Sequence, residues 1–308
     1  MMKSPVFTRW LRRLSAFLML VSLLLSCLSV SAESAESEDP YALPLDISVG
    51  GYPPDPACIT EDGYQDASVT VRKEMQRFND TDFYVVWVEI KSPTQLRTAV
   101  AGKPNERATA LPSRMAKARN AVFACNGEFY VQRTRDVFIW RQGVMFRNEP
   151  DPDKDVLIID DKGDFHIFTS PEKQQDIDAY LQSGGTIVNA FSFGPGLVVD
   201  GVKRDVSEYF HLFDGAARLA RTAMGQMGPL SYVFARCVGK TLASPGCNHQ
   251  QMADFMESLG VQQAYNLDGG QSCVMLLNGK YCDGTLHDSE RAQSDIIYIA
   301  SAVNPETK

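Results

Sequence analysis

The sequence predicts an α+β fold, in which a single domain is built on a largely antiparallel or mixed β-sheet with a few packed helices. Stretches with the β-branched and aromatic composition of strands outnumber stretches with helical periodicity. Short turns of the hairpin type join most neighbouring strands, and crossover helices are few. About 240–270 residues remain beyond the N-terminal segment and its linker, which is enough for one large domain.

The N-terminal segment has the composition of an export signal. Residues 1–13 carry four basic residues and no acid, an apolar run follows over 14–30, and small residues at 30–32 suit a signal peptidase. We therefore expect residues 1–32 to be a signal peptide and the chain to be periplasmic or extracellular. A retained membrane anchor and a lipoprotein stay open as alternatives, the latter because Cys27 ends a lipobox-like tetrapeptide. Contact with a membrane is expected only through this signal or a lipid anchor.

The composition and charge of the rest of the chain limit its possible structure and its possible partners. Residues 33–79 are predicted to be a linker and an irregular lead-in, because they are first acidic and Ser-rich and then rich in Pro, Gly and Asp. The formal net charge of -8 lacks the basic footprint of a nucleic-acid-binding protein. An anionic substrate is not excluded, because a few arginines in a cleft decide the local potential. Neither a Walker loop nor a G-x-G-x-x-G fingerprint is present, which argues against nucleotide-driven chemistry.

The pattern beyond residue 80 predicts the individual elements. Strands are expected at 83–88, 121–125, 137–140, 144–146, 156–159, 165–168, 186–190, 197–199, 232–237, 263–267 and 294–301. Helices are expected at 112–119, 171–181 and 248–259. The last helix is the best marked, with Asn248 as its cap, one apolar stripe and Gly260 as its stop. Asn278-Gly279 predicts a two-residue hairpin turn.

Six cysteines follow the export signal: Cys58, Cys125, Cys237, Cys247, Cys273 and Cys282. An even number in an exported chain favours disulfides, although six cysteines allow 15 pairings. Spacing favours Cys237 with Cys247 across a Pro-Gly turn. Cys273 and Cys282 would need a bulge, because Cys282 would face Met275 across the hairpin. Zinc is the weaker alternative, since the chain has no C-x-x-C pair.

The most informative segment for chemistry is 265–272. An apolar strand runs into Asp268 and then into Gly269 and Gly270. Glycines permit a tight turn and let backbone N–H groups approach a ligand closely. An ordinary Asx turn accounts for the same residues.

Three other segments carry candidate residues, each with a structural alternative. In 123–130 a strand runs into Asn126-Gly127, followed by Glu128 and two aromatics that suit a sugar ring, although a hairpin turn has the same pattern. Arg221-Thr222 precedes a strand and can hold an anion, although a solvated arginine fits equally. For the glycine-bent loop at 190–198 the structural interpretation is favoured.

Two histidines and two absent motifs narrow the chemistry further. His211 and His249 lack the spacing of metal ligands. We expect each of them to cap a helix, to lie in the core or to lie on the surface. Serine-hydrolase and zinc-protease interpretations lack support, because neither a G-x-S-x-G elbow nor an HExxH motif is present.

Taken together and in this order, these segments resemble the phosphodiester glycosidase family over residues 80–303. The most specific match runs from Asn266 to Ser272, followed by the Asn278-Gly279 hairpin. Supporting matches are Asn126-Gly127 with Phe129, the loop 193–199, Arg221-Thr222-Ala223 with Gly225, and the helix 248–259. The chain departs from the family at Gln271, Cys273 and Glu128, which bears on the width of the cleft and the substrate more than on the reaction.

The resemblance implies hydrolysis of the bond between a sugar's anomeric carbon and a phosphodiester oxygen, with a phosphodiester-linked glycan as substrate. The released phosphate monoester has a second pKa of about 6 and leaves readily. A strong general acid is therefore less necessary than in glycosidases that pair two carboxyls.

On the basis of this resemblance we expect three catalytic residues. Asp268 would serve as base or as stabiliser of the oxocarbenium, Arg221 would contact the phosphate, and Glu128 would be the second carboxylate. The expected substrate-binding residues are Asn126, Gly127, Thr222, Asn266, Gly269, Gly270 and Ser272. No cofactor is certain, and a divalent cation is left open.

Two rival functions stay open at this stage. A secreted or lipid-anchored module could hold an anionic glycan without cleaving it, and would not need Asp268. A hydrolase that cleaves at phosphorus would be expected to need a metal, with Asp268 and neighbouring acids as oxygen ligands.

Overall fold

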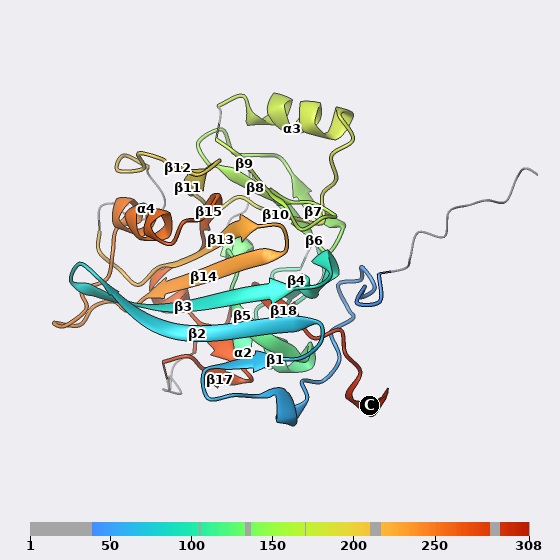
Figure 1. Ribbon diagram of the computed structural model, residues 1–308. Helices are drawn as coiled ribbons and strands as arrows, with labels where there is room; N and C mark the ends of the chain where they lie inside the picture. Colours follow the sequence, from blue (N-terminus) through green and yellow to red (C-terminus); the bar gives the residue numbers. More distant parts are fainter. Residues whose placement is uncertain are drawn as a thin grey trace, which may run out of the picture. The chain divides into compact units, whose positions relative to one another are not determined.

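The strands of this chain pair into three sheets in a computed structural model, which describes residues 39–104, 106–132, 137–169, 171–209, 217–283 and 290–307 (Figure 1). The chain divides into residues 1–40 and 41–308, and the fold given below is that of the second unit. The expected signal peptide, with Cys27, lies outside the described residues. Across the described part of the chain, no helix is long and apolar enough to cross a membrane.

The largest sheet has eight strands, and each printed pairing in it is antiparallel. In spatial order the strands are β1 (Gly63–Gln65), β2 (Val69–Phe78), β3 (Thr81–Ile90), β14 (Ser231–Cys237), β13 (Thr222–Gly228), β15 (Gln263–Asn266), β11 (Gly196–Val199) and β12 (Val202–Lys203). Segments that are more than a hundred residues apart in the sequence are therefore direct neighbours, as Figure 1 shows for β3 and β14.

Two five-stranded antiparallel sheets complete the strand content of the described residues. One has the order β7 (Val144–Asn148), β6 (Phe138–Arg141), β10 (Asn189–Phe191), β8 (Val156–Ile159) and β9 (Phe165–Phe168). The other has the order β17 (Lys280–Tyr281), β16 (Met275–Leu277), β5 (Ala121–Asn126), β18 (Asp295–Ala300) and β4 (Leu96–Val100). The predicted α+β class with a largely antiparallel sheet is confirmed.

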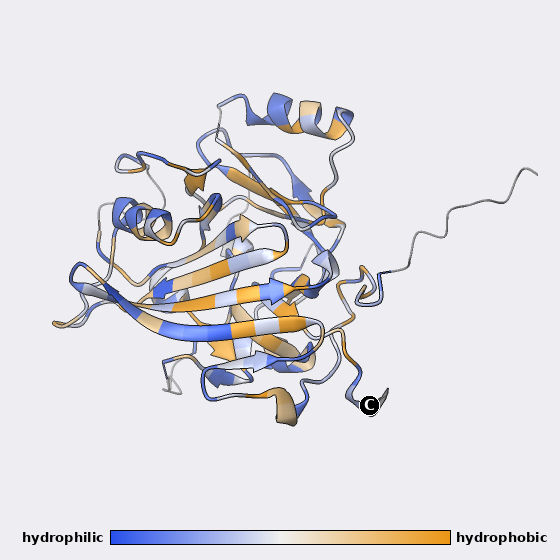
Figure 2. Ribbon diagram, viewed as in Figure 1, coloured by the Kyte–Doolittle hydropathy of each residue, from blue (hydrophilic) through white to orange (hydrophobic). Residues whose placement is uncertain are grey.

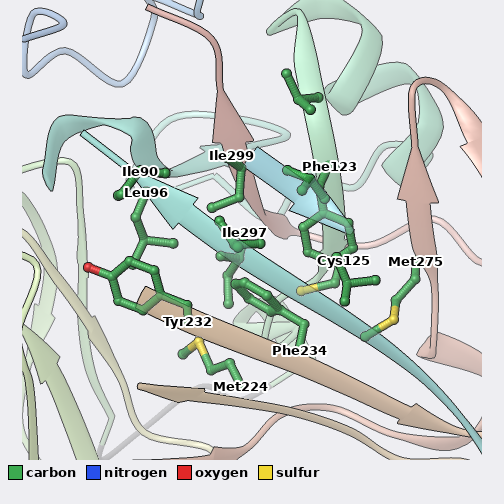
Figure 3. Packing of buried hydrophobic residues seen from close by; sticks show 14 of the residues in the cluster. Ile90, Leu96, Phe123, Cys125, Met224, Tyr232, Phe234, Met275, Ile297 and Ile299 are labelled. Carbon is green, nitrogen blue, oxygen red and sulfur yellow. The ribbon is translucent and has the colours of Figure 1, made fainter. Parts of the chain in front are cut away.

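The central core lies between the sheets. Side chains of the eight-stranded sheet, including Met224 and Phe234, pack against Phe123 of β5 and Ile297 of β18 (Figure 3). Alternate residues of the same strands enter different cores, because successive side chains of a strand point to opposite faces. In β18, for example, Ile297 belongs to the central core, and its neighbour Tyr298 belongs to the core on the other face of the sheet.

Each α-helix of the described residues packs on a different sheet. The helices are α2 (Pro112–Ala118), α3 (Lys173–Gln182) and α4 (His249–Ser258). Their buried side chains, such as Met115, Ile177 and Phe255, join the cores on the sheets of β5, β8 and β3, respectively. Many strands are thus covered on both faces, which explains why several of them have continuous apolar runs. Short 3-10 helices occupy Pro56–Cys58, Pro93–Gln95, Tyr130–Gln132, Gly270–Ser272 and Pro305–Thr307.

Two sequence-predicted termini are confirmed in atomic detail. The Asn248 side chain accepts a hydrogen bond from the amide of Gln251 at 2.8 Å, and the Gln251 side chain accepts one from the amide of Asn248 at 3.0 Å. This capping box begins α4, and Gly260 follows the helix with a φ of +81°. Asn278 and Gly279 both have positive φ, as a two-residue turn between β16 and β17 requires.

The lead-in expected over residues 33–79 is not irregular throughout, since β1 and β2 lie within it. β2 pairs with β3 along ten residues, and Met75 on it is 64% exposed. The second half of β2 is hydrophilic, as Figure 2 shows, so the sequence carries little of the apolar pattern that marks a strand. The short strand β4, with buried Arg97 and Thr98, was missed for the same reason.

Candidate active site

The ends of three strands come together at the candidate site. β5 ends at Asn126, β13 begins at Thr222, and β15 ends two residues before Asp268. The amide of Leu267 donates to the carbonyl of Thr222 at 2.8 Å, and the amide of Asp268 donates to the carbonyl of Gly127 at 3.3 Å. The structure therefore brings together three segments that the sequence marked separately.

The carboxamide of Asn126 connects these three segments. Its Nδ2 donates to the carbonyl of Asp268 at 2.8 Å and to that of Gly127 at 3.1 Å. Its Oδ1 accepts from the Thr222 hydroxyl at 2.9 Å and from the amide of Val274 at 3.2 Å. Asn126 and Thr222 are both fully buried. Because all donors and two acceptor positions of the carboxamide are used inside the protein, Asn126 positions the Asp268 loop and is not set up to contact the substrate.

The Asp268 carboxylate stands at the start of a tight turn. It is half-buried, and its Oδ1 accepts from the amide of Gly269 at 2.8 Å. The amide of Gly270 donates to the carbonyl of Ala220 at 2.7 Å. The two glycine amides, which we expected to contact an anion, thus hold the turn in place. Glycine is needed at 270 because φ there is +62°, and a Cβ at 269 would lie 3.0 Å from the Ala220 carbonyl.

Arg221 is 6% exposed, and its guanidinium is bonded on several sides. Nε donates to the carbonyl of Cys247 at 2.8 Å, Nη2 donates to that of Ala217 at 3.0 Å, and Nη1 lies 2.7 Å from Nε2 of His249. These contacts orient the positive charge beside the Asp268 turn. They also engage donors that a bidentate phosphate contact, the role we predicted for Arg221, would use.

His249 is a residue whose role the sequence did not reveal. It is the first residue of α4 and is 2% exposed. Burial, followed by the neighbouring Arg221 charge, lowers the pKa of His249 to about 3, while the backbone carbonyl of Tyr209 opposes this shift. The imidazole is therefore neutral at physiological pH, and Nε2 accepts a hydrogen bond from Arg221. His211, the other histidine considered, lies outside the described residues.

Glu128 lies in a buried ion cluster. Nη2 of Arg141 is 2.7 Å from Oε1 of Glu128 and 2.7 Å from Oδ2 of Asp295, and all three side chains have no exposure. The other oxygen of Glu128 accepts from the amide of Ser192 at 2.9 Å. Burial alone would lower the pKa of Arg141, but the carboxylates of Asp295 and Glu128 outweigh it and raise that pKa. A carboxylate held in this way is not placed to protonate a leaving group, so the expected acid role of Glu128 is not supported by its surroundings.

The remaining predicted substrate-binding residues have structural contacts. A Cβ at Gly127 would lie 2.2 Å from the Asp295 carboxylate, so the glycine allows close packing on the ion cluster. Asn266 donates from Nδ2 to the carbonyl of Gly194 at 2.8 Å and ties β15 to the loop before β11. Ser272 is buried, and its hydroxyl accepts from Nη1 of Arg291 at 3.3 Å.

A cavity of about 490 Å³ is lined in part by the Gly270–Ser272 turn. Its charged lining residues are Arg236, Lys240, Asp283, Glu290 and Arg291, and Ala220 and Gly270 connect it to the Arg221 and Asp268 segments. Sequence reasoning missed these residues. The available signal was Arg236, a charged residue next to the end of an otherwise apolar predicted strand.

Asp268 precedes the cavity-lining residues Gly270 and Gln271 by two and three positions. Burial raises the pKa of the cavity-lining Cys273 to about 12, and the neighbouring Arg236 charge opposes this shift. Within the described residues, no three His, Cys, Asp or Glu side chains are grouped as a metal site would require.

The six cysteines beyond the expected signal are free thiols in this structure. The sulfurs of Cys237 and Cys247 lie 3.1 Å apart, longer than the roughly 2.05 Å of a disulfide bond, so their pairing stays a prediction. The amide of Cys282 donates to the carbonyl of Met275 at 3.0 Å, which confirms the expected hairpin register.

Residues 119–300 match the sequence profile of the family described as Phosphodiester glycosidase. The chain belongs to the phosphodiester glycosidase family. The resemblance inferred from the ordered motifs is thereby confirmed.

Solved structures support the same fold. The catalytic domain of zebrafish N-acetylglucosamine-1-phosphodiester alpha-N-acetylglucosaminidase, auto-inhibited by its pro-peptide, is similar with a TM-score of 0.60 and 18% identity, over 82% of this chain and 87% of that chain. A hypothetical protein from Synechocystis is similar with a TM-score of 0.58 and 14% identity, over 75% of this chain and 62% of that chain. At these identities the likeness concerns the fold alone.

One relative has a sequence likeness. The SPbeta prophage-derived uncharacterized protein YomE of Bacillus subtilis is 25% identical over 190 residues, which are 60% of this chain and 29% of the relative. The match thus spans less than a third of the length of that relative.

Replacing Arg141 with Met is expected to lower the free energy of unfolding by about 3–5 kcal/mol, because it leaves two buried carboxylates without their cation. Denaturant unfolding, followed by tryptophan fluorescence, measures this loss. Arg77→Met is the matched control: Arg77 pairs with Asp82 at 2.6 Å, but its side chain is 52% exposed. The control should lose less than about 1 kcal/mol, and equal losses would contradict a special role for the buried cluster.

His249→Gln is expected to make the fold less sensitive to acid. The pKa of His249 is depressed in the folded state, so the unfolded chain binds a proton below pH of about 6.5 that the folded chain excludes until about pH 3. The contribution of neutral His249 to stability is therefore fully present above the unfolded pKa of about 6.5. It is lost progressively as pH falls from there toward about 3. Between pH 7 and pH 4 the parent should lose about 3 kcal/mol more unfolding free energy than the variant. Parallel stability curves would show that folding does not lower the pKa of His249.

Proposed function

We propose that this chain is a glycosidase that cleaves the bond between a sugar's anomeric carbon and a phosphodiester oxygen. The observation that carries the proposal is the placement of Asp268. Its half-buried carboxylate is held at the meeting point of three strands, beside a cavity with three cationic side chains. Membership of the phosphodiester glycosidase family supports this reaction class. The substrate class we propose is a phosphodiester-linked glycan, met outside the cytoplasm if residues 1–32 direct export.

In the proposed reaction, water attacks the anomeric carbon and transfers a proton to Asp268. The bond from this carbon to the phosphodiester oxygen breaks, and its electron pair stays on the phosphate oxygen. The products are a free sugar and a phosphate monoester. Asp268 also faces the positive charge that develops on the sugar ring, which a carboxylate stabilises.

The departing phosphate reduces the need for a general acid. A phosphate monoester is a stable anion, with a second pKa of about 6, so protonation is not required for it to leave. This is consistent with the burial of Glu128 in its ion cluster. We propose that Arg221 contributes a fixed positive charge, oriented by His249 and the Cys247 carbonyl, close to Asp268.

The test is hydrolysis of an N-acetylglucosamine-1-phosphodiester by the parent and by Asp268→Asn. We expect kcat/KM of the variant to fall by about a hundredfold or more, because a general base typically contributes 10²–10⁴-fold. The Asn side chain keeps an oxygen that can accept from the Gly269 amide, so the turn should persist. Asp200→Asn is the matched control, since Asp200 is exposed and has a φ of +51°, which Asn tolerates. The control should retain full activity.

Equal activity in the parent and Asp268→Asn would remove Asp268 from the mechanism. Hydrolysis in ¹⁸O-water locates the broken bond, because the label enters the sugar if the carbon is attacked. Label in the phosphate would contradict the proposed reaction and favour cleavage at phosphorus.

A further inference from the structure

The cavity beside the Gly270–Ser272 turn has the features of a binding site for an anion. Its volume of about 490 Å³ lies within the range of small-molecule sites. The lining includes three cations, Arg236, Lys240 and Arg291, against two carboxylates. The formal charge of the lining is therefore positive, although the whole chain is acidic.

Both carboxylates of the lining are already bonded to the protein. Asp283 accepts from Nη1 of Arg236 at 3.0 Å. Glu290 accepts from the amide of Ser113 at 2.8 Å and from its hydroxyl at 2.6 Å. Both carboxylates are thus engaged as structural acceptors. Asp283 offsets the charge of Arg236 in this pair, so Lys240 and Arg291 are the lining cations that have no ion pair within the described residues.

The cations differ in how they are held. Arg291 lies with its guanidinium carbon 4.6 Å from the centre of the Phe129 ring and donates to the Ser272 hydroxyl. Lys240 is exposed, and its ammonium group has no hydrogen bond or ion pair with the residues that the structure describes. Arg291 is therefore pre-oriented at the wall of the cavity, and Lys240 supplies a movable charge at its rim.

Two buried polar atoms of lining residues lack a partner. Nε of Arg236 has no acceptor, and Oε1 of Gln293 has no donor, within the described part of the protein. Arg236 as a whole is 8% exposed and Gln293 is 1% exposed. Buried polar groups are ordinarily hydrogen-bonded, so the unmet Nε donor of Arg236 is a group that an anion in the cavity can pair with after a small shift of the side chain. The Gln293 oxygen is an acceptor, so it would pair with a hydroxyl of the ligand and not with its phosphate.

We propose that this cavity binds the phosphate of the leaving group, as a phosphate monoester once the bond to the sugar is broken. The inference rests on the proposed function and assigns the phosphate to Arg236, Arg291 and Lys240. The sequence had pointed to Arg221 for this role. The guanidinium of Arg221 donates to two backbone carbonyls and to His249, and Arg221 is not among the residues that line the cavity.

The placement agrees with the proposed reaction. Gly270 and Cys273 of the wall follow Asp268 by two and five residues, so a substrate with its sugar at Asp268 can extend its phosphate into the cavity. Contacts of cations with the phosphate strengthen as negative charge builds up on the leaving oxygen, which is the moment at which they assist cleavage.

The experiment is calorimetric titration of the full chain with glycerol 3-phosphate, which is a phosphate monoester without the sugar that leaves. We expect the parent to bind it, and Arg291→Gln to raise Kd about tenfold, as loss of a charged hydrogen bond does. Lys240→Gln should raise Kd about threefold, as expected for an exposed charge. Both residues are at least partly exposed, so these variants should fold even if Arg236→Gln does not.

Matched controls separate the cavity from general charge effects. Lys162→Gln and Arg72→Gln remove exposed charges on the β8–β9 turn and on β2, away from the cavity, and should leave Kd unchanged. No binding by the parent, or binding that the cavity variants leave unchanged, would overturn the proposal. Failure of the two proposals is distinguishable: cavity-dependent binding without any phosphodiester hydrolysis would keep the anion site and remove the glycosidase.

Discussion

The rest of the site depends on the ion pairs that the buried guanidinium of Arg141 forms with Glu128 and Asp295. It comes from β6 and bonds both to Glu128, just beyond β5, and to Asp295, the first residue of β18, so it joins two sheets. Burying three charges has a high desolvation cost, which is offset only when each charge is paired and hydrogen-bonded. Further bonds from the Ser192 amide, the Phe129 amide and the Ser294 hydroxyl meet this condition. The cluster thereby holds the chain that follows Asn126.

The segments next to this anchored chain are held by further hydrogen bonds, which reach the Asp268 turn. Asn126 is the last residue of β5 and holds the Asp268 turn against this strand. Its carboxamide donates to the Asp268 carbonyl and accepts from the Thr222 hydroxyl. His249 orients Arg221 through the hydrogen bond that its Nε2 accepts. His249 is the first residue of α4, and the capping box fixes the first turn of that helix. Of the residues we predicted, several therefore act by holding Asp268 and Arg221 in place, and fewer than expected are set up to touch a substrate. Such supporting contacts are what keep a catalytic group in a productive geometry.

The sequence predicted much of this molecule, and its failures have physical causes. Strong local patterns, such as the Asn248 cap with Gly260 and the Asn278-Gly279 turn, depend on neighbouring residues and were correct. β2 was missed because its outer half faces solvent and carries charged residues. The pairing of Glu128 with Arg141 and of His249 with Arg221 could not be predicted, because these contacts arise only when separate elements pack together. The cavity cations were missed for the same reason.

The contacts of the Asn126 carboxamide have a consequence for how the protein reaches its folded form. Its partners Thr222 and Asp268 are 96 and 142 positions away along the chain. Contacts of such long range are formed late and slowly in folding, since a large loop must close before they stabilise anything. The arrangement around Asp268 is therefore absent from any partly folded chain that lacks one of the three strands. Activity should accordingly appear during refolding only when the whole structure is complete. A proteolytic cut between residues 126 and 222 is expected to disturb the position of Asp268.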